Sequence, residues 1–235
     1  MNDLQGHRDT RGFTFHSLGL VLLVLLIVYG CFVPEHGIFI LCLAINVLIH
    51  ELGHFSAGRA FNCVVHNLSV FFVPAITYKA NERSAIYDLR HNTWRDTEWT
   101  IGALPLGGYT TLASGNKPTW QRLIISAAGI IANVLTFGAC YVLSNLSLHG
   151  LLDLFINTMM YLSIVLAVLN ILPFYPLDGA DVCTAAYEIA TGRQPSKTFM
   201  TAYKVIGVAL FIYLFYINPE ILATIIDKIL PSGIS

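Results

Sequence analysis

Five long apolar stretches alternate with polar connections along this chain. Crossing the hydrocarbon core of a bilayer as an α-helix takes about 20 apolar residues. The pattern therefore predicts an all-α polytopic membrane protein with about five transmembrane helices, at residues 17–33, 37–60, 121–144, 151–172 and 198–217. The first stretch follows basic residues, as in a signal peptide, but no Ala-x-Ala-like cleavage site comes after it, so we expect it to be retained.

The connection at residues 61–120 is the only long polar segment in the sequence. Residues 63–73 are rich in β-branched and aromatic side chains, which favour strands, and Pro74 interrupts this run. Residues 99–112 predict a second short strand system, with Gly107-Gly108 as its turn. We therefore expect a small strand or hairpin insertion between the second and third helices.

Shorter elements follow the fourth apolar stretch. Pro173 and Pro176 predict the end of that helix, because proline breaks helices. Residues 180–191 predict a short helix that ends at Gly192. A further short helix is expected at residues 219–230, and the sequence leaves its placement open.

Composition and charge support a membrane location. The 235 residues are 55% hydrophobic and only 11% charged, whereas a soluble domain carries about a quarter charged residues. The formal net charge of −1 offers no basis for binding nucleic acid. We expect one membrane-embedded domain over residues 1–235, in contact with membrane lipid and without a nucleic-acid partner.

The basic residues predict the orientation of the chain. If the five helices cross the membrane one after another, the connections between them lie on alternate sides of the bilayer. All but one of the 13 Lys and Arg residues then lie on the same side of the membrane, and the exception is Lys228. The positive-inside rule then places the N-terminus and the 61–120 loop in the cytoplasm and the C-terminus outside.

The candidate chemistry lies in the last third of the second apolar stretch, in the run His-Glu-Leu-Gly-His. Helix positions i and i+4 share a face, so His50 and His54 can bind one metal ion, and Glu51 can act on a metal-bound water as a general base. Ionisable groups in a lipid-spanning helix are costly and indicate function. The run predicts a catalytic site for one Zn²⁺ ion; the plainer alternative is a helix whose polar end happens to carry two histidines.

A catalytic zinc of this type needs a third protein ligand and an open fourth position. Asp178 is the predicted ligand, because the fourth helix ends on the same side of the membrane as the two histidines and the two prolines after it unwind the chain. Gly179 is expected to permit a sharp turn there. Asp178 could instead cap a helix, and Asp181 and Glu188 are alternative third ligands.

Asn170 lies in an apolar run at a similar depth. Its amide could hydrogen-bond a neighbouring helix or hold the backbone of a substrate, and the sequence leaves both interpretations open. Residues 126–133 form a seam of small residues, which lets helices approach closely.

HELGH in a transmembrane helix, with NILPFYPLDG at residues 170–179, resembles the site-2 protease family of intramembrane zinc metalloproteases. The resemblance implies that the two histidines and the LDG aspartate bind zinc, that the glutamate is the catalytic base, and that the asparagine ahead of the prolines contacts the substrate backbone. By motif position these residues are His50, His54, Asp178, Glu51 and Asn170.

Two further stretches carry the resemblance. Residues 103–109, ALPLGGY, resemble the family's PLGGY hairpin near the active site, which implies that Gly107 and Gly108 contact substrate. Residues 122–133 resemble its AGPxxN helix, with Ile130 in place of the usual proline. The chain resembles a minimal bacterial-type member without a PDZ or CBS domain. This implies a bacterial cell (inner) membrane location, with the active site toward the cytoplasm.

The sequence thus predicts a zinc-dependent intramembrane endopeptidase that cleaves in or near transmembrane segments of membrane-protein substrates. We expect residues 63–112 to pair with an unwound substrate by strand addition. One alternative is a membrane-anchored zinc peptidase that acts on soluble or cytoplasmic-face substrates, with a glutamate such as Glu188 as third ligand. Another is a non-catalytic membrane metal-binding protein, although a purely structural site needs no base such as Glu51.

Overall fold

The computed structural model describes residues 12–79, 97–146, 149–217 and 220 of the chain. The helix predicted at 219–230 lies outside these residues apart from Glu220. In chain order the elements are β1 (Gly12–Phe15), α1 (Ser17–Phe32), α2 (Pro34–Ala60), β2 (Val65–Lys79), β3 (Glu98–Leu112), α3 (Thr119–Ser144), α4 (Leu151–Asn170), α5 (Asp178–Thr191), α6 (Lys197–Ile212) and the π-helical turn η3 (Tyr213–Ile217).

Most of the described chain is helical, and three of its helices, α2, α3 and α4, are long and apolar enough to cross a membrane. Together with the composition, they make the chain an integral membrane protein. Helix α1 is apolar but has only 16 residues, and α6 also has 16 before η3 continues it. The predicted count of five membrane spans therefore stays a prediction.

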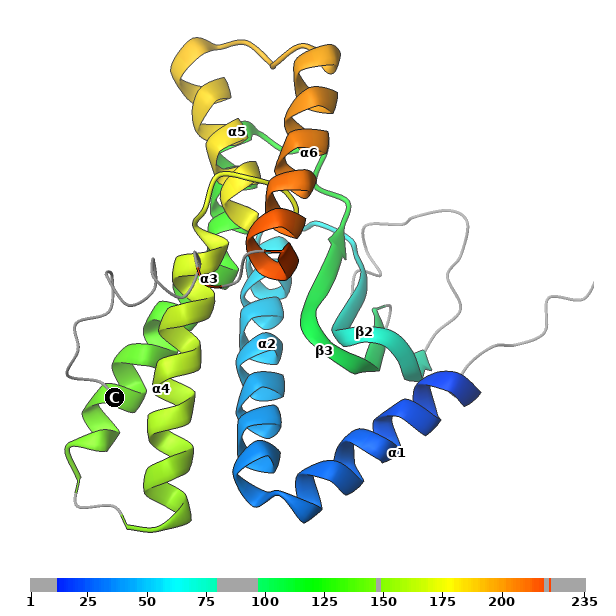
Figure 1. Ribbon diagram of the computed structural model, residues 1–235. Coiled ribbons are helices and arrows are strands. Elements are labelled where there is room, and N and C mark those ends of the chain that lie inside the picture. The colour runs from blue at the N-terminus through cyan, green and yellow to red at the C-terminus, as the bar shows by residue number, and fades with distance from the viewer. Residues whose placement is uncertain (1–11, 80–96, 147–148, 218–219, 221–235) are drawn as a thin grey trace, which may run out of the picture.

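Helix α2 runs through the middle of the molecule, with the sheet on one side and α3 and α4 on the other (Figure 1). Apolar residues of α2, α3 and α4 form the core between these helices: Cys42, Cys140, Ile156, Met159, Met160 and Leu162. A buried polar side chain also links α2 to α4. Asn46 of α2 donates hydrogen bonds to the carbonyls of Cys42 and Met159 and accepts one from Ser163. Such bonds between membrane helices add to the packing that holds α2 against α4.

The sheet has the order β1-β2-β3, and its first strand was not predicted from the sequence. β1 pairs with the end of β2, from Gly12 opposite Lys79 to Phe15 opposite Ile76. β3 contacts both halves of β2, because Trp99 is paired with both Leu68 and Tyr78. β2 is therefore bent around the beginning of β3.

Two predictions about this region are wrong. Pro74 does not end the first strand, since β2 continues to Lys79; the backbone is bent just before Pro74, where Phe71 and Val73 have left-handed φ angles of 70° and 57°. Gly107-Gly108 is not a turn but lies inside β3, where Gly108 pairs with Val70. The two strands are joined through residues 80–97, of which 80–96 lie outside the described part of the chain.

The segment after α4 brings the chain back to α2. The predicted short helix is present as α5, and Gly192 ends it in a left-handed conformation, with φ of 66°. Gly179 is not at a sharp turn, as was expected, but in the first turn of α5. Gly179 instead allows α5 to pack closely against the segment just after α4, because a Cβ atom there would lie 2.4 Å from the carbonyl oxygens of Ile171 and Leu172.

Candidate metal centre

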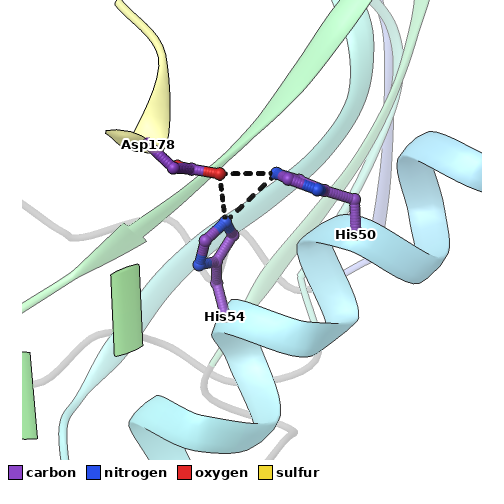
Figure 2. Close-up of side chains that lie close together, drawn as sticks. All are labelled: His50, His54 and Asp178. Atoms are coloured by element: carbon purple, nitrogen blue, oxygen red, sulfur yellow. Dashed lines mark hydrogen bonds and ion pairs between the residues drawn. The ribbon is translucent and has the colours of Figure 1, made fainter. Parts of the chain in front are cut away.

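Two histidines from α2 and one aspartate from α5 meet at a single point (Figure 2). Oδ2 of Asp178 lies 2.8 Å from Nε2 of His50 and 3.1 Å from Nε2 of His54. The two Nε2 atoms are 3.2 Å apart. Both histidines are buried and Asp178 is partly buried. The three residues predicted as metal ligands are thus brought together.

The spacing of these three atoms fits a zinc ion. Ligand atoms at about 2.0–2.1 Å from a tetrahedral ion lie roughly 3.3 Å from one another. The three observed separations of 2.8, 3.1 and 3.2 Å are close to that value. These three residues would hold the ion and leave its fourth position to water or substrate, as catalytic zinc chemistry requires.

Small residues of α3 make room for the two imidazole rings. A Cβ atom on Gly129 would lie 2.4 Å from Nε2 of His54 and 2.7 Å from Nε2 of His50. A Cβ atom on Gly53 would lie 2.5 Å from the carbonyl oxygen of Ala128. The small-residue seam at 126–133 therefore allows α2 and α3 to approach closely at the site, as predicted.

The second nitrogen of each ring has a partner that orients it. Nδ1 of His54 lies 2.7 Å from the carbonyl oxygen of Ile125, so it donates and leaves Nε2 available to a metal. Nδ1 of His50 lies 3.2 Å from Nδ2 of the fully buried Asn133, whose Oδ1 has no partner among the described residues. When Oδ1 of this amide faces the ring, Nδ1 of His50 donates to it and Nε2 is available to a metal in the same way.

A carboxyl group must be ionised to bind a metal. Burial by itself would raise the pKa of Asp178, but the two imidazole rings beside it outweigh that effect and lower the pKa to about 2. Asp178 is the first residue of α5 but not its N-cap, which is Leu177, so the helix-capping alternative does not describe it.

The two alternative third ligands have other partners. Asp181 accepts a hydrogen bond of 2.6 Å from the Tyr175 hydroxyl. Glu188 forms an ion pair with Arg122 and thereby links α5 to α3. Among the described residues, the only group of three or more histidines, cysteines and carboxylates with metal-binding spacing is the one in Figure 2.

A cavity of about 700 Å³ opens beside this centre. It is lined by the two histidines, Asp178 and the buried Glu51, and also by the three residues predicted to contact substrate: Asn170, Gly107 and Gly108. The Asn170 amide donates to the Leu166 carbonyl of its own helix, at 3.1 Å, rather than to a neighbouring helix. Glu51 accepts a 2.7 Å hydrogen bond from the Thr110 hydroxyl.

Sequence reasoning missed Thr110 and the contact of Asn133 with His50. Thr110 is one of several threonines in a strand, and no local signal distinguishes it. Asn133 is the asparagine of the stretch that resembles the AGPxxN helix, which is a signal that could have singled it out, but its partner comes from another element.

Comparison with known proteins agrees with this geometry. An integral membrane protein with a His-His-Asp metal centre and a neighbouring glutamate has the features of a membrane metalloprotease. A sequence model described as "Peptidase family M50" matches residues 38–151 and 144–214. The chain therefore belongs to peptidase family M50, the site-2 protease family, and the resemblance noted from its motifs is confirmed.

Several curated proteins are similar to part of the chain. "Putative zinc metalloprotease PM1991" of Pasteurella multocida is 30% identical over 112 residues, which cover 41% of this chain and 23% of that protein. "Regulator of sigma E protease" of Haemophilus influenzae is 28% identical over 114 residues, covering 42% of this chain and 23% of that protein. The matched region thus spans about a quarter of the length of these relatives.

The fold also matches a solved structure. The site-2 protease from Methanocaldococcus jannaschii superimposes with a TM-score of 0.53, covering 91% of this chain and 84% of that one, at 18% sequence identity. At this identity the likeness shows the fold alone.

Proposed function

We propose that the protein is a zinc-dependent intramembrane endopeptidase that hydrolyses peptide bonds in or near transmembrane segments of membrane-protein substrates. The observation that carries this proposal is the meeting of His50, His54 and Asp178 in a membrane protein, with Glu51 lining the same cavity. These three residues would hold one zinc ion. When bound, zinc supplies Lewis-acid chemistry: it polarises a carbonyl group and makes water acidic enough to react near neutral pH.

Glu51 is the proposed general base. Its carboxylate takes the proton of the attacking water and then passes it to the leaving amine. The side chain is buried and lines the cavity next to both histidines, as this role requires. A purely structural or transport site needs no such base, so Glu51 favours an enzyme over a non-catalytic metal-binding protein.

The substrate must be extended where it is cut, because an intact helix keeps its carbonyl groups in hydrogen bonds. We propose that the unwound segment lies along β3 at Gly107 and Gly108 and adds to the sheet as a strand. Both glycines line the cavity, and a Cβ atom on Gly108 would lie 3.1 Å from Cγ of Glu51. Asn170 lines the same cavity and is the proposed contact for the substrate backbone.

The proposed location is a bacterial inner membrane, with the N-terminus and the active site toward the cytoplasm. The distribution of Lys and Arg supports this orientation through the positive-inside rule. A peptidase for soluble substrates that uses Glu188 as ligand has less support, because Glu188 is paired with Arg122.

The test combines zinc analysis with cleavage of a transmembrane reporter substrate, both on detergent-purified protein. We expect the wild type to hold about one zinc ion and to cleave, because a catalytic zinc site binds one ion with three protein ligands. Asp178→Ala should lose both zinc and cleavage. Glu51→Gln should keep zinc and lose cleavage by roughly a hundredfold or more.

The matched control is Asp181→Asn, which changes a carboxylate one helical turn further along α5. It should keep both zinc and cleavage. Asp178→Ala protein that still binds zinc and cleaves would overturn the ligand assignment, and an active Glu51→Gln protein would overturn the proposed reaction.

A further inference from the structure

We propose that Thr110 is a positioning residue for the catalytic base, so that the strand lining the substrate cavity also sets the geometry of Glu51. This inference rests on the proposed function, in which Glu51 is the base and β3 receives the substrate.

The contact between Thr110 and Glu51 is short and directional. The Thr110 hydroxyl oxygen lies 2.7 Å from Oε2 of Glu51 and 3.3 Å from the Glu51 main-chain carbonyl oxygen. A hydroxyl has one proton to donate. The shorter bond to the carboxylate is charge-assisted and is therefore the stronger of the two.

Both partners are held in place by their surroundings. Glu51 is only 5% exposed on α2. Thr110 is partly buried in β3, and its backbone is paired with Leu68 of β2. Two residues earlier in the same strand, Gly108 packs so closely on Glu51 that a Cβ atom there would be 3.1 Å from Cγ of the glutamate. The side chain of Glu51 is thus confined by β3 along its length.

A carboxylate with one oxygen held by a fixed hydroxyl cannot rotate freely about its last side-chain bond. Thr110 therefore keeps the Glu51 carboxylate in one orientation beside the metal centre. A general base must be within hydrogen-bond reach of the proton that it takes, so a wrong orientation lowers the rate without altering metal binding.

The same strand segment connects this bond to the substrate. Residues 107–110 all line the cavity. A substrate strand that pairs at Gly107 and Gly108 engages backbone only two or three residues from the Thr110 hydroxyl. The strand proposed to receive the substrate is thus also the strand whose Thr110 hydroxyl orients the base.

Thr110→Val is the decisive variant, because valine has nearly the shape of threonine, favours strands and replaces only the hydroxyl with a methyl group. We expect it to lower kcat by roughly ten- to hundredfold, as expected for loss of one hydrogen bond to a charged group. Its KM should stay within about twofold and its zinc content unchanged, because valine keeps the shape of the cavity wall and the ligands are not altered.

Two companion variants separate positioning from structure. Thr110→Ser keeps the hydroxyl and should restore kcat to within about threefold of the wild type. Thr111→Val makes the same chemical change at the next, exposed residue of β3 and should leave kcat unchanged.

Wild-type kcat in Thr110→Val, an equal loss in Thr110→Ser, or loss of zinc from Thr110→Val would each overturn the inference. Failure of the proposed function itself is recognised separately, since Glu51→Gln would then remain active.

Discussion

At the residue scale, the buried Asn133 matters because its side-chain amide lies 3.2 Å from Nδ1 of His50, a proposed metal ligand. An amide with Oδ1 toward this nitrogen would accept the Nδ1 proton and leave Nε2 for the proposed metal. Asn133 lies on α3 and His50 on α2, so the contact also holds the His50 ring against α3, which packs closely on it at Gly129.

Removing this partner should weaken zinc binding. Asn133→Ala is expected to lower zinc affinity by roughly 10- to 100-fold, the usual effect of losing a hydrogen-bond partner of a ligating histidine. Competition with a chromogenic chelator measures the affinity directly. Asn133→Asp keeps an acceptor oxygen and should retain most of it; if Asp weakened binding as much as Ala does, the amide would be oriented the other way, with its nitrogen toward His50.

At the element scale, β3 carries the wall of the cavity that faces the metal centre. Tyr109 is paired with Ser69 of β2, and its ring stacks on Phe72 at a centroid distance of 6.1 Å. Proline has no backbone N–H group and so cannot take part in a ladder of strand hydrogen bonds as a donor.

Tyr109→Pro should therefore impair cleavage by about tenfold or more, the cost of roughly one strand-pairing interaction with substrate, while zinc stays bound. Tyr109→Phe is the control, since it keeps the backbone N–H and the ring and should cleave normally. A single-turnover cleavage assay should show this difference between the two variants. Unimpaired cleavage by Tyr109→Pro would contradict the strand-addition hypothesis.

The sequence predicted the helices of this fold more closely than its sheet. The second, third and fourth predicted spans agree with α2, α3 and α4 to within a few residues, because an apolar helical run is a local property. β1 was missed because its partner, the end of β2, is more than 60 residues away in sequence. The sequence indicated an interruption at Pro74, which has an obvious local signal, and gave no sign of the left-handed residues Phe71 and Val73 that bend β2.

At the scale of the whole molecule, the proposed orientation places α5 on the cytoplasmic side and the connection between α3 and α4 outside. Cys183, an exposed residue of α5, and His149, exposed in that connection, are suited to test this. Labelling uses a membrane-impermeant maleimide on intact cells.

In a Cys31→Ser background, His149→Cys should react in intact cells, whereas Cys183 should react only after the membrane is permeabilised. The physical reason is the positive-inside bias of the Lys and Arg residues. The opposite labelling pattern would show that the active site faces outward, and the assay does not depend on enzymatic activity.

The sequence by itself determined the apolar spans and the positions of His50, Glu51 and His54 on one helix, because helix periodicity and the cost of exposing polar groups to lipid act on contiguous residues. It also indicated Asp178, through a topology that returns the chain to the same membrane side. Only the tertiary structure decided that Asp178, 124 residues from His54, comes within 3.1 Å of it, and that Thr110 bonds Glu51. Such contacts depend on how closely helices and strands pack. Packing is set at residues such as Gly179 and Gly108, which lie against neighbouring backbone, and Gly129, which lies against the two imidazole rings, because a methyl group would not fit at any of them.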